Sequence, residues 1–111
     1  MNERFDVVFL EDAKLFLDKL ASSTRTKILF NIRKAQLLND AELFKKLTME
    51  IWEFRTLFNR QCYRIFAFWD KRHKPHALVV CTHGIHKTSR RTPEKDLKKA
   101  IALRSQYFNN N

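Results

Sequence analysis

The chain has 111 residues, of which 44% are apolar and 31% are charged. This balance is typical of a globular protein and excludes a disordered chain, and the length fits one domain, 1–111, with a real core. The formal net charge of +10 favours polyanionic partners: RNA, DNA, ribosomes or an acidic protein. Because no apolar run is long enough to cross a bilayer and the N-terminus lacks the pattern of a signal peptide, we expect a cytoplasmic protein without a membrane partner.

The two cysteines, Cys62 and Cys81, both lie inside apolar, strand-like runs. We expect them to be reduced core thiols in a cytoplasmic protein. Neither their spacing nor the four scattered histidines match a set of metal ligands. The sequence therefore predicts no metal site and no cofactor.

The first half of the chain predicts a strand followed by two helices. Residues 4–10 form a short apolar run typical of a β-strand. Apolar residues then recur at helical spacing over 13–20 and again in a second segment that ends near Leu38. We expect these segments to form an αα-hairpin, followed by a connection over residues 39–50 whose apolar side chains contact the core.

Residues 51–69 form the most aromatic stretch of the chain, and their alternation predicts a β-hairpin. The turn is expected at Asn59-Arg60, because asparagine tolerates a positive φ. In this register Arg55 lies directly opposite Arg64 on one face. Trp52, Phe54, Tyr63 and Ile65 occupy the other face.

Two arginines directly opposite each other are unfavourable, because like charges repel across a strand pair. One interpretation is an anion site, most simply a phosphate, held by the two planar guanidinium groups. The other is that each arginine pairs with a carboxylate, for which Glu53 is a candidate, or extends into water. The hairpin alone does not decide between these interpretations.

A basic turn over residues 70–75 leads into an apolar run over 77–83, which predicts a strand buried on both faces. If this strand pairs with the preceding one through a tight turn, Cys81 falls near Arg64. His83 then falls on the same face as the two arginines.

Residues 84–91 are expected to form a basic loop, and Thr92-Pro93-Glu94 predicts the start of the last helix. The predicted order is therefore β-α-α-β-β-β-α. Sequential antiparallel strands with an early helical pair define an α+β fold: a small, mainly antiparallel sheet with helices packed on it.

Four motifs occur in order along the chain: Trp52-Glu53-Phe54-Arg55, Arg64-Ile65, His83-Gly84-Ile85-His86-Lys87 and Thr92-Pro93. Their order resembles that of HigB-like toxins of the RelE/ParE superfamily, including phage-derived members, over about residues 5–108. The family usually has two adjacent lysines where this chain has Lys87-Thr88. Arg90 and Arg91 are candidates for the second basic position.

The resemblance implies the α+β architecture of the RelE-like microbial RNases and the role of a toxin in a type II toxin–antitoxin system. The implied activity is that of an mRNA interferase, a ribosome-dependent mRNA endonuclease that inhibits translation. The implied partners are the ribosome, mRNA and a helix-turn-helix antitoxin of the HigA/Xre type, with no small-molecule substrate. Such cleavage uses the 2′-hydroxyl as the nucleophile without a metal, and it needs a base, an acid and cations on the phosphate.

The residues that the resemblance implies as catalytic are Arg55, Arg64, His83, Lys87, His86 and Glu53. The two arginines would hold the phosphate, and either histidine would exchange protons near neutral pH. Lys87 would add charge or bind the mRNA backbone. Glu53 would be the base if it faces the arginines unpaired, and otherwise their counter-ion. Each residue also has a structural alternative, such as an ion pair for Arg64 or a strand-edge position for His83.

The predicted contacts with RNA or the ribosome are Arg90, Arg91, Lys71, Arg72 and Lys74. They concentrate in two basic segments. The aromatic residues Trp52, Tyr63 and Trp69 are interpreted as core residues in preference to base-stacking platforms.

Two other functional classes use the same scaffold. One is a ParE-like inhibitor that binds a topoisomerase and performs no chemistry. The other is a non-catalytic module that binds RNA or the ribosome. The histidines and the paired arginines favour the endonuclease.

Overall fold

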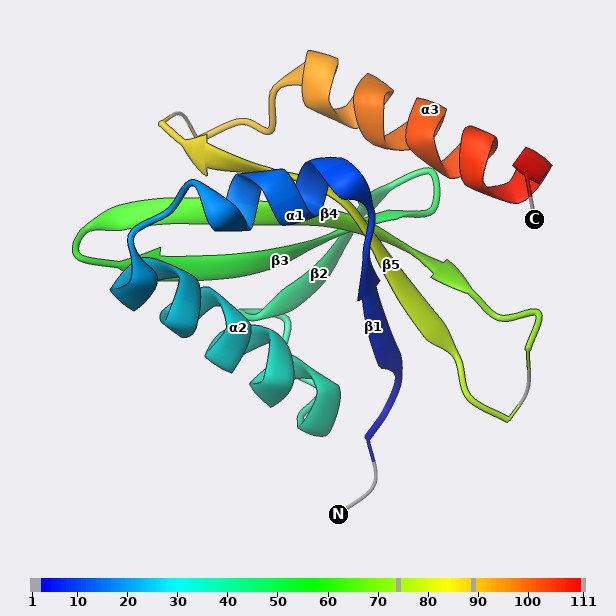
Figure 1. Cartoon of the computed structure of the whole chain (residues 1–111), viewed down its shortest axis with the longest axis horizontal. Coiled ribbons are helices and arrows are strands. Elements are labelled where there is room, and N and C mark those ends of the chain that lie inside the picture. Colours follow the sequence, from blue (N-terminus) through cyan, green and yellow to red (C-terminus); the bar gives the residue numbers. More distant parts are fainter. Residues whose placement is uncertain (1–2, 74, 89, 111) are drawn as a thin grey trace.

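The computed structural model describes residues 3–73, 75–88 and 90–110 (Figure 1). The elements in chain order are β1 (Asp6–Phe9), α1 (Glu11–Asp18), α2 (Ser22–Leu37), β2 (Phe44–Thr48), β3 (Ile51–Phe58), β4 (Gln61–Asp70), β5 (Leu78–Lys87) and α3 (Glu94–Asn110). The strands form one sheet in the order β1-β5-β4-β3-β2. Only β1 and β5 pair in parallel; the other three pairings are antiparallel. The predicted α+β class with a mainly antiparallel sheet is confirmed.

The order contains one strand more than the sequence predicts, because β2 occupies part of the expected connection over residues 39–50. Phe44 is buried, as expected for this segment, but its backbone also pairs with Phe54 of β3. The turn between β2 and β3 places Met49 and Glu50 at positive φ, 46° and 72°. A two-residue hairpin turn needs this conformation, yet neither residue is the glycine or asparagine that normally signals it.

The central hairpin has the predicted turn and register. Asn59 and Arg60 both adopt positive φ, 52° and 63°, which matches the right-handed twist of the flanking strands. Arg55 pairs directly with Arg64. The register of the candidate site is therefore confirmed.

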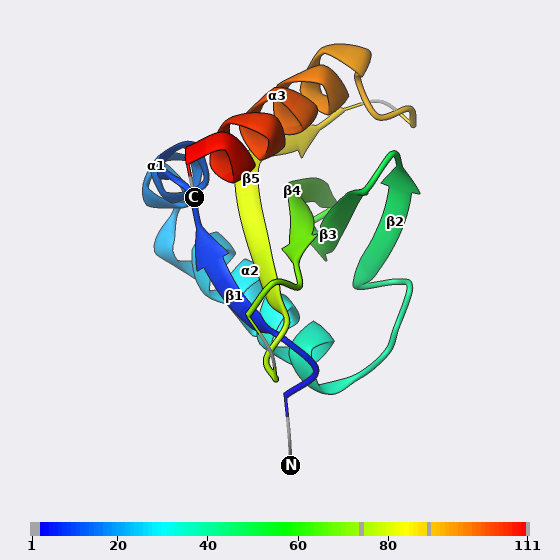
Figure 2. The same cartoon turned by 90° about the vertical axis from the view of Figure 1, so that its right-hand side faces the viewer.

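The helices cover opposite faces of the sheet (Figures 1 and 2). The cluster beneath α1 and α2 contains Phe5, Ala13, Leu17, Ile28, Ile32, Ala35, Phe44, Phe54, Ile65, Ala67, Val79 and Cys81. The cluster beneath α3 contains Ile51, Phe66, Phe68, Val80 and Ala100. None of the described helices is long and apolar enough to span a membrane.

Phe16 of α1 packs directly on Gly84 of β5. A Cβ atom on this glycine would lie 2.3 Å from the Phe16 ring, far inside van der Waals contact. The glycine therefore permits close helix–sheet packing, which is one reason for a glycine in a strand.

A bulge in β5 decides which side chains reach the α3 face. Phe66 pairs with His83 and Ala67 pairs with Cys81, so Thr82 is the extra residue. Cys81 therefore lies opposite Ala67 beneath α1 and α2, and the prediction that it falls near Arg64 is wrong. His83 shares the face of the arginines as predicted. The bulge turns it there although it is only two residues from Cys81.

Strand β5 also runs four residues further than expected, through Lys87. Residues 84–87 are thus part of the sheet and not of a basic loop. They pair with the start of β4, where Lys87 lies opposite Cys62. This pairing fixes Lys87 near the arginines.

Candidate functional site

Side chains on the α3 face form three rows across β3, β4 and β5. The rows are Glu53–Phe66–His83, Arg55–Arg64–Ile85 and Leu57–Cys62–Lys87. Where α3 no longer covers the sheet, the second and third rows border an open hollow of about 420 Å³. Its lining consists of Arg55, Cys62, Arg64, Lys87, Thr88 and Arg90.

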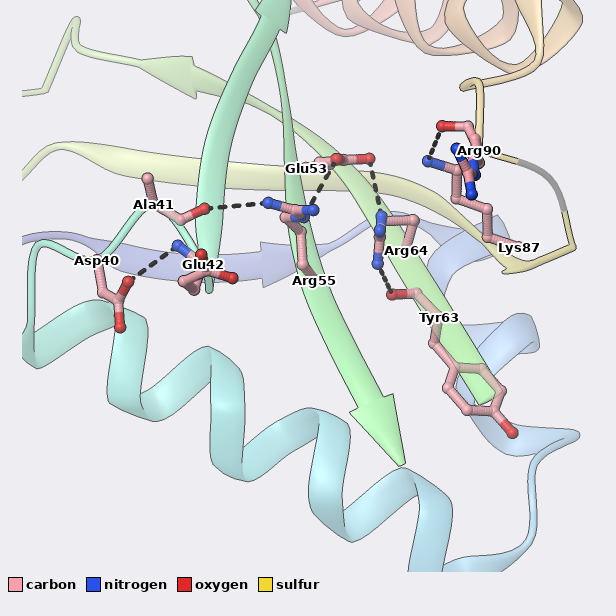
Figure 3. Close-up of polar contacts among 9 residues, drawn as sticks. All are labelled: Asp40, Ala41, Glu42, Glu53, Arg55, Tyr63, Arg64, Lys87 and Arg90. Atoms are coloured by element: carbon pink, nitrogen blue, oxygen red, sulfur yellow. Dashed lines mark hydrogen bonds and ion pairs between the residues drawn. The ribbon is translucent and has the colours of Figure 1, made fainter. Parts of the chain in front are cut away.

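Glu53 lies between the two guanidinium groups (Figure 3). One carboxylate oxygen is 3.4 Å from Arg64 Nε, and the other is 3.7 Å from Arg55 Nε. These contacts are longer than charge-assisted hydrogen bonds, which measure about 2.7–2.9 Å. Glu53 Oε1 and both Nε atoms are buried and have no hydrogen-bond partner within the described residues. The cluster is therefore partly neutralised, but its hydrogen-bonding capacity is not satisfied.

Backbone carbonyl groups hold the second side of each guanidinium. Arg64 Nη1 donates to the Tyr63 carbonyl at 3.3 Å, and Arg55 Nη1 donates to the Ala41 carbonyl at 3.5 Å. Across the described part of the chain, Nη2 of each arginine has no partner. Both guanidiniums are thus anchored by their Nε and Nη1 sides and keep donor capacity for a ligand.

Lys87 adds a third cation beside the arginines. Its ammonium group donates to the Arg90 carbonyl at 3.0 Å. Burial, and then the positive charge of Arg64, lower the pKa of Lys87. A lysine in this environment releases a proton more readily than a lysine in water.

An adjoining hollow shares the two arginines and adds Glu42, which is exposed in the segment before β2. Asp40 fixes this segment by accepting a hydrogen bond from the Glu42 backbone at 2.9 Å. The residues that line the two hollows include four cations and one carboxylate, Glu42, and Glu53 contacts two of these cations from behind. The site therefore has an excess of two positive charges and favours an anion.

His83 shares this face but does not line either hollow. It is 3% exposed, stacks on Phe66 at 4.9 Å, and contacts Asp96 of α3 through Nε2 at 3.2 Å. Its Nδ1 lies 3.0 Å from the Thr82 hydroxyl. Burial lowers the pKa of His83. Nε2–H donates to Asp96, and the single Thr82 hydroxyl proton is within reach of both His83 Nδ1 and the Phe66 carbonyl at 3.3 Å.

His86 projects from the opposite face of the sheet. It pairs with Tyr63, stacks on the Tyr63 ring at 5.1 Å and hydrogen-bonds Gln61. The structure thus does not bring His86 to the arginines, because adjacent strand residues point to opposite faces.

The predicted RNA-contacting residues divide between two ends of the molecule. Arg90 lines the arginine hollow, and Arg91 is exposed in the same segment. Arg72 pairs with Asp70 at 2.8 Å at the other end of β4, and Lys71 lies next to it. Lys74 lies outside the described residues.

Two lining residues were not expected at the site. Cys62 is a free thiol, as predicted, but it is half-buried and lines the hollow instead of the core. Its spacing of two from Arg64 in a strand was the signal that could have placed it. Glu42 had no comparable signal, because its position depends on how the chain returns from α2.

Metal-ligating side chains do not gather in the structure. Within the described ranges, no three His, Cys, Asp or Glu side chains are grouped as a metal site requires. The side chains around the hollow are instead donors that match phosphate oxygens, namely guanidinium and ammonium groups.

The fold and this site define a class: a small α+β sheet protein with an open, cation-rich hollow that fits an anionic ligand. The sequence model of the phage-derived protein Gp49-like family (DUF891) matches residues 15–105. The chain belongs to this toxin–antitoxin-associated, RelE-like family, whose members are generally toxin modules. Membership implies an antitoxin partner. A search of curated proteins gave no match.

Proposed function

We propose that the protein is a HigB-type toxin that cleaves mRNA on the ribosome. One observation carries this proposal: two guanidiniums share one carboxylate beside an open hollow, and the contacts that hold them involve Nε and Nη1 but not Nη2. A purely structural ion-pair cluster would satisfy these donors internally. A phosphate diester is a ligand that planar guanidinium donors bind well.

In the proposed reaction, the 2′-hydroxyl oxygen attacks the adjacent phosphorus, and the bond from phosphorus to the 5′-oxygen breaks. Arg55 and Arg64 stabilise the negative charge that grows on the phosphate oxygens. Lys87 gives a proton to the leaving oxygen, in keeping with its lowered pKa. Glu53 is too buried to reach the hydroxyl and serves as the counter-ion that positions both arginines.

We assign the base to Glu42. It is the only carboxylate that lines the arginine hollows within the described residues. A base must accept the proton of the 2′-hydroxyl from within hydrogen-bond reach. Neither histidine of the predicted set lines either hollow, which leaves Glu42 as the exposed acceptor. Glu42→Gln should therefore slow cleavage, and unchanged single-turnover rates would remove Glu42 from the mechanism.

The decisive experiment is cell-free translation with the purified chain, followed by mapping of mRNA 5′ ends. We expect discrete cuts in translated message and none in the same message without ribosomes. A message with a 2′-deoxy group at the cut site should resist, because it lacks the nucleophile. Intact message together with blocked DNA supercoiling would select the topoisomerase inhibitor. Ribosome binding without cuts would select the non-catalytic module.

A helix-turn-helix antitoxin of the HigA/Xre type is the proposed partner. An acidic segment of such a protein would cover the cationic hollow, and charge complementarity would speed capture. Expression of the chain alone should arrest growth, and co-expression with the product of the adjacent gene should relieve the arrest. Unimpaired growth with the folded chain alone would count against a toxin.

A further inference from the structure

A further hollow lies on the other face of the sheet. It has a volume of about 360 Å³ and is lined by Lys46, Glu50, Trp52, Trp69 and Lys71. Trp52 and Trp69 pack against the cluster beneath α1 and α2, whereas Glu53 and Arg55 face α3. This hollow is therefore separate from the two hollows that share the arginines. The chain has only two tryptophans, and both are here.

The aromatic wall of this hollow is held rigidly. Trp52 stacks on Phe44 with ring centroids 4.8 Å apart, and Trp69 meets Trp52 edge-on at 5.8 Å. Phe5 packs edge-on against Trp69 at 5.2 Å. Because these contacts fix the rings before any ligand arrives, binding loses little side-chain entropy.

Cations border the tryptophans. The Lys71 ammonium lies 5.1 Å from the Trp69 ring centroid. Lys46 is 3.9 Å from Glu50, a long and exposed contact that contributes little to stability. Two lysines against one glutamate leave an excess of one positive charge. An apolar partner would have to desolvate these ammonium groups without a matching charge, which is costly.

We propose that this hollow binds an unpaired nucleotide of single-stranded RNA, with the base against the tryptophans and the phosphates near Lys46 and Lys71. Fixed aromatic rings beside a basic groove are the combination that binds unpaired nucleotides without sequence preference. The choice of RNA rests on the proposed function, whereas the site is independent of cleavage. The strand would then contact both faces of the sheet, and only the α3 face would perform chemistry.

The test uses intrinsic fluorescence, because both tryptophans report on this hollow. Titration of the purified chain with a short oligouridylate should quench the emission, whereas a fully paired RNA duplex should not. Lys46→Ala combined with Lys71→Ala should weaken the quenching by about tenfold or more in midpoint concentration. Lys45→Ala is the matched control. Lys45 precedes Lys46 in β2, pairs with Glu53 and points to the opposite face, so this variant removes one charge away from the hollow.

Emission that saturating oligouridylate leaves unchanged would overturn the proposal. So would quenching that is equal in the double lysine variant and in Lys45→Ala, or equal with duplex RNA. Cleavage without quenching would reject this site and keep the proposed function. Quenching without cleavage on ribosomes would keep this site and reject the proposed function.

Discussion

Two carboxylate–guanidinium clusters lie on this sheet, and they are built differently. Asp70, at the end of β4, is fully buried and accepts hydrogen bonds from Arg72 Nε at 2.9 Å and Nη2 at 2.8 Å. The Arg72 backbone N–H at 3.1 Å and the Tyr107 hydroxyl at 2.8 Å complete the set. The hydrogen bonds from Arg72, above all, hold the pKa of Asp70 well below its usual range.

The cluster of Glu53, Arg55 and Arg64 has the opposite character. One carboxylate serves two guanidiniums at 3.4 Å and 3.7 Å, and buried donors stay without acceptors in the described structure. The Asp70 cluster connects β4 to α3 and is satisfied within the fold. A buried group left unsatisfied costs about 1–3 kcal/mol, so the Asp70 cluster is the better stabilised of the two, and under the proposed function the Glu53 cluster instead positions the arginines for a ligand.

The largest expected effect is on catalysis at the Glu53 cluster. Arg64→Ala should lower single-turnover mRNA cleavage by about 100-fold or more, because it removes a donor that stabilises charge in the transition state. Arg64→Lys should restore little, since a point charge cannot replace a planar fork. Arg72→Ala is the control from the Asp70 cluster: cleavage per folded molecule should change by less than about threefold. Equal losses of cleavage in Arg64→Ala and Arg72→Ala would show that the two clusters do not differ in function.

The next effect is on stability at the Asp70 cluster. Asp70→Ala should lower the free energy of unfolding by about 2–4 kcal/mol, because it removes several hydrogen bonds to a buried charge. Urea denaturation measures this loss. Because the pKa of Asp70 is lower in the folded than in the unfolded state, its contribution is complete above the pKa of an unfolded aspartate, about 3.9, and is lost as pH falls further. A difference between the two proteins that persists undiminished in strong acid would contradict this assignment.

A smaller effect should distinguish the clusters by anion binding. Inorganic phosphate at about ten times its dissociation constant should stabilise the wild-type chain by about 1.4 kcal/mol. Chloride at equal ionic strength is the reference condition. We expect Asp70→Ala to keep the full stabilisation by phosphate and Arg64→Ala to lose it. A stabilisation that survives in Arg64→Ala would place the anion elsewhere.

The smallest effect concerns Lys87. Its pKa is lowered by burial and by the charge of Arg64, so the protonated form is disfavoured in the folded state. Wild-type stability should rise as pH approaches the pKa of an unfolded lysine, about 10.4. Lys87→Met should therefore be as stable as the wild type at neutral pH or more stable by about 0.5 kcal/mol, while cleaving more slowly. A clear loss of thermal stability in Lys87→Met would show that Lys87 mainly supports the fold.

The sequence by itself determined the central hairpin and the pairing of Arg55 with Arg64. Alternation has a period of two in strands, and a turn at Asn59-Arg60 sets the register, so local chemistry was sufficient. The helical spacing of apolar residues likewise predicted α1, α2 and α3 from local sequence. The family motifs also lie on continuous segments and are readable without a structure.

Tertiary structure alone decided which other charged residues join the paired arginines. The Thr82 bulge turns His83 to the α3 face, and its contact with Asp96 of α3 keeps it buried away from the hollow. The extension of β5 through Lys87 depends on pairing with β4, and Glu42 reaches the arginines only because the chain returns from α2. These positions depend on contacts between residues that are distant in sequence. The free energy of such contacts cannot be derived from a local pattern of side chains.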